Sequence, residues 1–280
     1  MAARWLPPFA QPPPGYRIDW DAVGLPRPIA QWRFNVPGSA LVPDIERTGL
    51  HAYITGQSAG SVWVTTPWGP ATQLASSPAA AWVVQTSQPL NWSQGMAVAA
   101  HVIFPDSWAV DNMIIASKSV SKWQWQMQTG TIPDKWSYRN GGIFAHAAIP
   151  NGAAAWIGKP TVIAGWNEGE GSGGIERVGM WSPDGLSSVG SATMPSSSTS
   201  WSKDLMGIGN RSKLGGGATY ENYTGPILCV TLWQVPLQLG LAEKLAGPLP
   251  MWVPQKYWMF GATAGITVTV PWHLIVRQVD

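Results

Sequence analysis

The feature that most constrains this chain is a continuous apolar run near its C-terminal end. Residues 226–235 (PILCVTLWQV) are rich in apolar and β-favouring side chains, which is typical of a strand covered on both faces. The proline that follows ends the run, because proline cannot donate a hydrogen bond to a sheet. Leu237, Leu241 and Leu245 then recur every four residues, which predicts a short helix over residues 237–246 with one apolar side.

The rest of the chain is typical of short strands separated by turns. Asp184 and Gly185 lie between two such strands and predict a hairpin turn. No repeat of fixed period is present. About a dozen strands with one short helix indicate an all-β, antiparallel, two-sheet sandwich. The predicted strands, besides the run above, cover residues 29–34, 51–54, 61–65, 81–85, 95–104, 113–117, 122–128, 141–147, 160–166, 175–181, 187–192 and 204–208.

The C-terminal quarter of this pattern resembles a known family. An Ile-Gly pair, a glycine-rich loop, the apolar strand, a leucine-rich helix and a Trp-x-x-Pro exit follow one another as in laminin-G-like, concanavalin A-like jelly rolls of tailed-bacteriophage virion proteins. One departure is Leu241, where those sequences usually carry glutamate. The resemblance covers roughly residues 28–254 and implies a jelly-roll domain over that range. The matching residues are Ile208, Gly209, Gly225, Ile227, Val230, Leu232, Trp233, Leu237, Leu245, Pro248, Trp252 and Pro254.

The composition indicates a protein whose surface is covered by partners. Charged residues make up 11% of the chain, against roughly 25% in a typical soluble domain, although 19 residues are tryptophan. A surface with so few charges is poorly solvated by itself, so we expect an assembly, including a homo-oligomer. The net charge of +2 gives no electrostatic basis for nucleic-acid binding. No apolar run is long enough to span a membrane, and the N-terminus lacks the apolar core of a signal peptide.

The two ends of the chain are predicted to be extended arms. Residues 1–27 combine runs of proline with Trp5, Phe9, Tyr16 and Trp20. Proline-rich sequence favours an extended conformation, and the aromatic side chains would anchor this arm on a neighbouring subunit. At the other end, residues 255–280 contain ITVTV at 266–270 and HLIVRQV at 273–279, both β-like. These segments either complete the chain's own sheet or pair with the edge of a neighbour's sheet.

No pattern of catalytic residues is present. Glycosidases need a pair of carboxyl groups in a fixed geometry, and the nearest approach to one, Glu168 with Glu170, lies in the glycine-rich segment NEGEGSGG, for which we predict a solvated loop. His101, in an apolar strand, and the single cysteine, Cys229, are predicted to be core residues. We therefore expect a protein that is not an enzyme.

A bound cofactor is not expected either, with calcium as the one open case. Asp106, Asp111 and Asn112 fall in one predicted loop, PDSWAVDN, and offer oxygen ligands of the type that Ca²⁺ takes. Loop acids of this kind more often form turns, so we predict no metal.

Four tryptophans in predicted loops are candidates for sugar stacking or for subunit contacts. Aromatic platforms flanked by polar groups bind sugars, and tryptophan is also enriched at protein interfaces. These residues are Trp68, Trp108, Trp136 and Trp201. The resemblance implies a structural virion protein on the outer surface of the particle, either a capsid decoration or cement protein or a neck or tail component, with other virion proteins as partners. The alternative is a carbohydrate-binding module or adhesion protein that recognises host surface glycan.

Overall fold

The computed structural model describes most of the chain up to residue 254. The described residues are 5–6, 16–46, 48–56, 58, 62–74, 80–85, 96–106, 113–118, 123–129, 135–140, 143–168, 174–193, 205–210, 223–235, 237, 240, 243–247 and 249–254.

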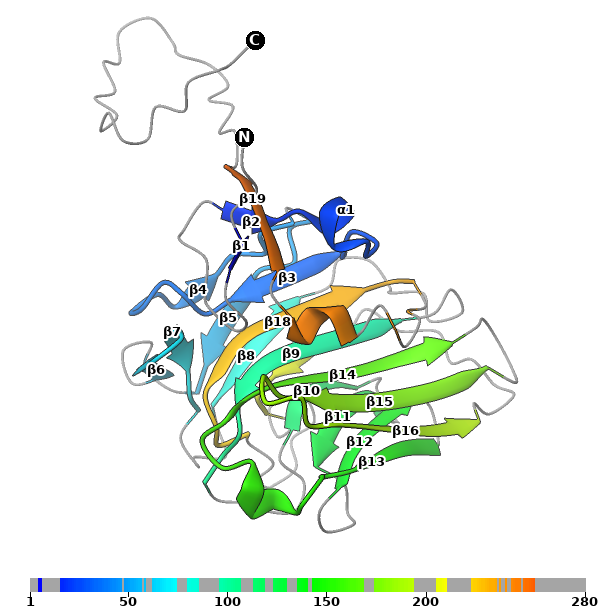
Figure 1. Ribbon diagram of the computed structural model, residues 1–280. Coiled ribbons are helices and arrows are strands. Elements are labelled where there is room, and N and C mark those ends of the chain that lie inside the picture. The colour runs from blue at the N-terminus through cyan, green and yellow to red at the C-terminus, as the bar shows by residue number, and fades with distance from the viewer. Residues whose placement is uncertain are drawn as a thin grey trace, which may run out of the picture.

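Two eight-stranded antiparallel sheets pack face to face (Figure 1). The first, the β18 sheet, has the order β16 (Ser187–Thr193), β15 (Ile175–Trp181), β14 (Pro160–Glu168), β9 (Ala97–Ile103), β18 (Ile227–Trp233), β7 (Gly69–Thr72) and β6 (Trp63–Thr66), with β3 (Ala30–Arg33) also paired to β18. The second, the β8 sheet, has the order β13 (Ile143–Ala148), β12 (Lys135–Asn140), β11 (Trp123–Thr129), β10 (Met113–Lys118), β17 (Leu205–Ile208), β8 (Ala81–Gln85), β5 (Ala52–Thr55) and β4 (Leu41–Val42). The predicted all-β, two-sheet jelly-roll-like sandwich is therefore confirmed.

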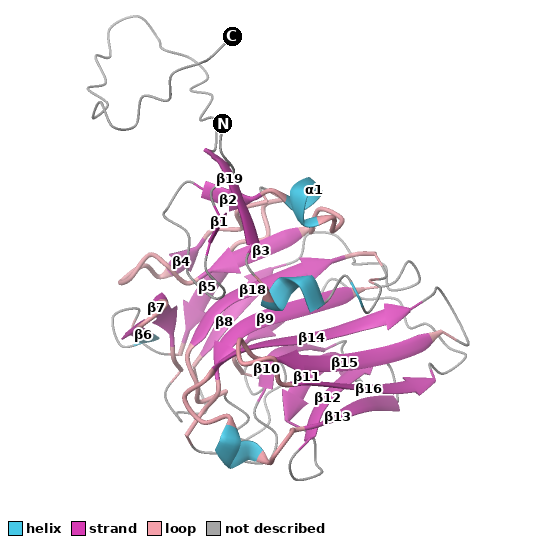
Figure 2. Cartoon of the chain, viewed as in Figure 1, coloured by secondary structure: helices cyan, strands magenta, loops and turns pink. Residues whose placement is uncertain are grey.

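Three strands from the two ends of the chain form a third, small sheet. In it β19 (Leu249–Pro254) lies between β1 (Trp5–Leu6) and β2 (Tyr16–Ile18). The helices are short: α1 (Trp20–Val23) and the 3₁₀ turns η3 (Ala153–Ala155) and η5 (Lys244–Ala246). Figure 2 shows how little of the molecule is helical.

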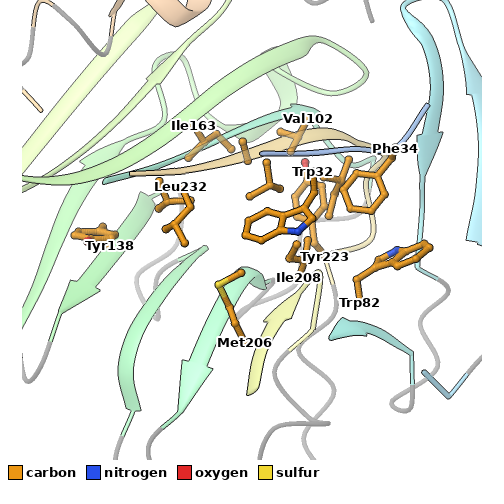
Figure 3. Close-up of a cluster of buried hydrophobic side chains, with 14 of the residues drawn as sticks. Trp32, Phe34, Trp82, Val102, Tyr138, Ile163, Met206, Ile208, Tyr223 and Leu232 are labelled. Atoms are coloured by element: carbon orange, nitrogen blue, oxygen red, sulfur yellow. The ribbon is translucent and has the colours of Figure 1, made fainter. Parts of the chain in front are cut away.

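The main core fills the space between the two sheets and is rich in aromatic side chains. In this core Phe34 meets Trp82 of the β8 sheet, and Tyr138 of the same sheet lies further along, near Leu232 (Figure 3). The ring centroids of Phe34 and Trp82 are 5.4 Å apart. The buried indole nitrogen of Trp82 donates to Thr72 Oγ1 at 2.9 Å, so this core tryptophan keeps a polar partner, as buried indoles usually do.

Most of the predicted elements are present. Strand β18 is buried at all seven positions, which confirms that both of its faces are covered. The hairpin at Asp184 and Gly185 joins β15 to β16, and Gly185 has a φ of 80°, a conformation that glycine adopts without steric cost. Strand β3 was expected to be half-buried, but all four of its residues are buried because a further layer covers its outer face.

The sequence analysis did not predict the strands β1, β2, β4, β7, β12 and β19, and β7 and β12 show why. Strand β7 begins with Gly69 and Pro70, which are turn signals, and the pairing with β6 and β18 orders it. Strand β12 includes Trp136, which was expected in a loop, and pairs along its whole length with β13. The predicted helix is confirmed as a short one, with Gly240 and Glu243 helical and the 3₁₀ turn η5 at its end.

Candidate functional site

The outer face of the β18 sheet, turned away from the β8 sheet, carries a second apolar layer that we call the cover. The cover consists of residues 18–25 together with Leu237 and residues 243–246. Its apolar side chains pack on Ala97, Val162 and Trp233 of the sheet. In Figures 1 and 2 the helical segment of the cover lies in front of β9 and β14.

Local sequence explains why the first part of the cover forms. Asp19 caps α1, since its Oδ1 accepts a hydrogen bond from the amide of Ala22 at 3.1 Å, as N-cap residues do. Gly24 ends the turn with a φ of 70°, the usual left-handed helix end. This single helical turn directs Trp20 and Val23 onto the sheet, and both are buried.

A buried carboxylate holds the cover in place. Glu46 accepts a hydrogen bond from the indole of Trp20 at 3.0 Å and forms an ion pair with Arg27 at 2.9 Å. Asp44 in turn positions Glu46, because its Oδ1 accepts from the amides of Gln31 and Glu46, each at 3.0 Å. The Trp20 ring also meets Trp233 edge-on, with 5.7 Å between centroids. The sequence analysis missed Glu46 because a lone acid gives no signal until its partners are known.

Trp20 therefore corrects one prediction. It was expected to anchor an arm on a neighbouring subunit, but its ring is only 5% exposed within its own chain. The physical reason is the hydrogen bond and ring contact just described, which satisfy both the polar and the apolar parts of the indole. Trp5 and Tyr16 lie in strands β1 and β2, and Phe9 lies outside the described residues.

Beneath the cover lies a buried polar cluster on adjacent strands. Arg33, Cys229 and His101 are cross-strand neighbours on β3, β18 and β9. Arg33 donates from Nε and Nη2 to Gln31 Oε1 at 3.0 and 2.6 Å, and Gln31 donates to Thr231 Oγ1 at 2.9 Å. Burial lowers the pKa of Arg33 to about 9 and raises the pKa of the Cys229 thiol, because both charged forms are disfavoured away from water. A thiol of raised pKa is a poor nucleophile, in agreement with a packing role.

His101 joins this cluster to the cover. Its Nε2 lies 3.1 Å from the carbonyl oxygen of Leu245. Burial, with a smaller contribution from the charge of Arg33, lowers the pKa of His101 to about 4. The neutral ring that results can donate a hydrogen bond to the Leu245 carbonyl, which links the cluster to the cover and helps to stabilise it. The prediction that His101 is a core residue is confirmed.

The first and last described strands of the chain meet at one pole of the sandwich. Trp5 pairs with Pro250 and Leu6 with Leu249, while Met251 pairs with Ile18 on the other side of β19. Figure 1 shows this small sheet at the top of the molecule, with β16 at the opposite side. The first and the last described strands of the chain are therefore direct neighbours.

The structure separates the four tryptophans that were candidates for sugar stacking. Trp68 is partly buried at the turn between β6 and β7 and packs against a buried cluster of Ala71, Ile103 and Leu228. Trp136 is fully buried and meets Phe104 edge-on at 6.2 Å, so the expectation that it lies in a loop, free to stack on a sugar or to contact a subunit, is wrong. Trp108 and Trp201 lie outside the described residues.

The structure describes Glu168 but not Glu170, the two carboxylates weighed as a catalytic pair. Glu168 was expected in a solvated loop, but it ends strand β14 and forms an ion pair with Arg177 at 2.7 Å. Glu170 lies outside the described residues, as do Asp111 and Asn112 of the calcium candidates, while Asp106 is exposed. Among described residues, no group of three or more His, Cys, Asp or Glu is placed to hold a metal ion.

None of the described helices has the length and apolar character needed to cross a bilayer.

Comparisons with known proteins give structural but not sequence matches. No protein-family model matches the sequence, and neither does any curated protein. Trypanosoma rangeli sialidase in complex with the inhibitor DANA matches with a TM-score of 0.53 at 12% identity, over 80% of this chain and 34% of the sialidase. The binding domain of botulinum neurotoxin DC in complex with SialylT matches with a TM-score of 0.51 at 10% identity, over 78% of this chain and 51% of that chain.

Tailspike protein 2 of Escherichia coli O157:H7 bacteriophage CAB120 matches with a TM-score of 0.44 at 15% identity, over 65% of this chain and 25% of the tailspike. This chain thus spans between a quarter and about half of the length of these proteins. The matches to the sialidase and the neurotoxin domain agree with the predicted class of fold, an all-β, antiparallel sandwich.

Proposed function

We propose that this protein is a non-enzymatic structural component of a tailed-bacteriophage particle, attached to neighbouring subunits through the pole where its two ends meet. The observation that carries the proposal is the β1–β19–β2 sheet, which gathers both ends of the chain in one place. In this proposal the apolar and aromatic residues that precede β1 and follow β19 in the sequence contact one partner surface. The family resemblance of residues 28–254 supplies the phage context.

The low charge of the chain supports an assembled state. With charged residues at 11%, the surface is better suited to contact with other subunits than to solvation alone. The arms would stabilise the particle by removing apolar area from water, at about 25 cal/mol per Å². A place on the capsid as a decoration or cement protein, or in the neck or tail, is consistent with this mechanism.

The experiment is to remove residues 1–15 and count copies in particles assembled with the variant. This deletion spares β2 and the cover, so the sandwich is expected to keep its circular dichroism and unfolding transition. Loss of the anchoring aromatic residues should lower incorporation at least about tenfold, because each buried side chain of this kind contributes about 1.5–3 kcal/mol. Tyr53→Ala, on an exposed position of β5, is the control. Unchanged copy number with a folded variant would refute attachment through this arm.

Glycan binding is the second candidate, favoured by the fold likeness to a neurotoxin binding domain in complex with SialylT and to a sialidase. Trp68 is the described candidate whose ring is only partly buried. A glycan array that includes sialylated oligosaccharides would test it, with Trp68→Ala expected to abolish any signal and Tyr53→Ala to leave it unchanged. Absence of binding by the intact protein would exclude this candidate.

A further inference from the structure

Strand β16 is an edge strand without the features that normally protect sheet edges. Exposed edges present unpaired backbone groups, and proteins usually shorten them, charge them or interrupt them with proline. Strand β16 has seven residues, SSVGSAT, with no charge and no proline. It pairs with β15 in continuous register from Ile175–Thr193 to Trp181–Ser187. Within the described part of the chain, no strand pairs with its other side.

The other edges of the two large sheets are better protected or shorter. Strand β4 has two residues and is followed by Pro43, and β6 has four and is followed by Pro67. Strand β13 has six residues and carries an ionisable side chain, His146. Strand β16 is therefore the longest edge and the one best suited to accept another strand.

The two faces of β16 specify what kind of strand would fit. Its outward face carries Ser187, Val189, Ser191 and Thr193, all exposed, while its inward face carries the small residues Ser188, Gly190 and Ala192. A Cβ added to Gly190 would lie 1.6 Å from the carbonyl oxygen of His146, so β13 covers this inward face closely. An added strand would meet hydroxyl groups on one face and small side chains beside β13 on the other.

The segment at residues 266–270, ITVTV, has this complementary pattern. Alternate residues of a strand point to opposite faces, so Ile266, Val268 and Val270 share one face and the two threonines share the other. Threonine beside serine or threonine is a favourable cross-strand pair. The branched apolar side chains would then lie on the inward face, beside β13.

We propose that residues 266–270 of one copy of this chain add a strand to the β16 edge of a second copy. The last described strand before the donor segment is β19, whereas β16 is four strands from β18 in the sheet order, or roughly 19 Å away at the usual strand spacing. Figure 1 shows β19 and β16 on opposite sides of the sandwich. Because donor and acceptor are different surfaces, the contact repeats from copy to copy and generates a ring or an open chain. This inference takes only the phage-particle context from the proposed function, since the pairing itself concerns two copies of the purified protein.

The test compares the masses of four purified proteins in solution by light scattering: the full chain, a variant lacking residues 255–280, the double variant Val189→Lys with Ser191→Lys, and Thr65→Lys. Lysine on an edge strand opposes pairing, and Thr65 is an exposed position on β6, the opposite edge of the same sheet. The full chain and Thr65→Lys should be oligomers, and the other two should be folded monomers.

A second measurement uses a labelled peptide of residues 262–280, which should bind the protein that lacks residues 255–280. Introducing Val189→Lys and Ser191→Lys into that truncated protein should weaken the binding of the peptide at least about tenfold, or by about 1.4 kcal/mol.

Each other outcome overturns the proposal. A monomeric full chain would show that no second copy is bound, and an oligomer that persists without residues 255–280 would show that another surface is used. An oligomer that needs residues 255–280 but tolerates the two lysines would exclude β16 as the acceptor. Circular dichroism of each variant ensures that a monomer is a folded one. Particle incorporation can persist in any of these cases, so failure here is distinct from failure of the proposed function.

Discussion

Strands β18 and β16 have the same length and belong to the same sheet, yet they have opposite environments. Every residue of β18 is buried, whereas exposed and half-buried residues alternate along β16. Between the two strands the outer face of the sheet changes from an interior surface under the cover to a surface open to solvent. The comparison shows that a single sheet here serves both as the middle layer of a three-layer region and as the outer layer of a two-layer one.

The covered region is also the more demanding one energetically. It encloses an arginine, a histidine and a thiol, and burial of such groups is unfavourable unless hydrogen bonds compensate. The Gln31, Thr231 and Leu245 contacts provide that compensation. The open region has no equivalent requirement, which leaves β16 able to serve as a contact surface.

Truncating the cover should produce the largest effect. Trp20→Ala removes a buried indole with its hydrogen bond to Glu46 and its contact with Trp233, and should lower the free energy of unfolding by about 3–5 kcal/mol. Urea unfolding measures this directly. Tyr53→Ala, at an exposed position, should change it by no more than about 0.5 kcal/mol. Equal effects would mean that the cover is not part of the folded core.

Acid should weaken the covered region through His101. Its pKa is about 4 in the folded protein and ordinarily 6.5 when unfolded, so the unfolded chain takes up the proton first. The stability that the neutral ring contributes is complete above pH 6.5 and falls as the pH drops toward 4, by up to about 3 kcal/mol. Unfolding free energies at pH 7 and pH 4.5 should therefore differ more for the wild type than for His101→Gln. Parallel pH profiles would contradict this assignment.

A smaller effect is expected where the edges of the two sheets touch. Gly190→Ala places a methyl group against the His146 carbonyl and should cost about 1–3 kcal/mol as β13 and β16 move apart. Gly240→Ala is the matched control, because no atom lies within 4 Å of the added carbon, and it should be neutral or slightly stabilising. Thermal unfolding distinguishes the two. A neutral Gly190→Ala would show that the two edges are less closely packed.

Several elements of the fold were predictable from local sequence. The run at 226–235 predicted a doubly covered strand, and Leu237 with Leu245 predicted a helix with one buried side, where both leucines are buried. The aromatic residues were harder to place. Trp20 and Trp136 stand among polar and proline residues that resemble an arm and a loop, and only their partners, Glu46, Trp233 and Phe104, decide that both are buried.

The sequence by itself determined the class of fold, because strand length, alternation and turn residues are local properties of the chain. Only the tertiary structure decided which strands have a second covered face, which residues close the polar cluster and where the two ends meet. Those features depend on contacts between distant segments, such as Gln31 with Thr231 and the indole of Trp233 with the carbonyl of Pro26. Periodicity reports how residues are distributed about one element, but burial of its other face depends on which remote segment is bound there.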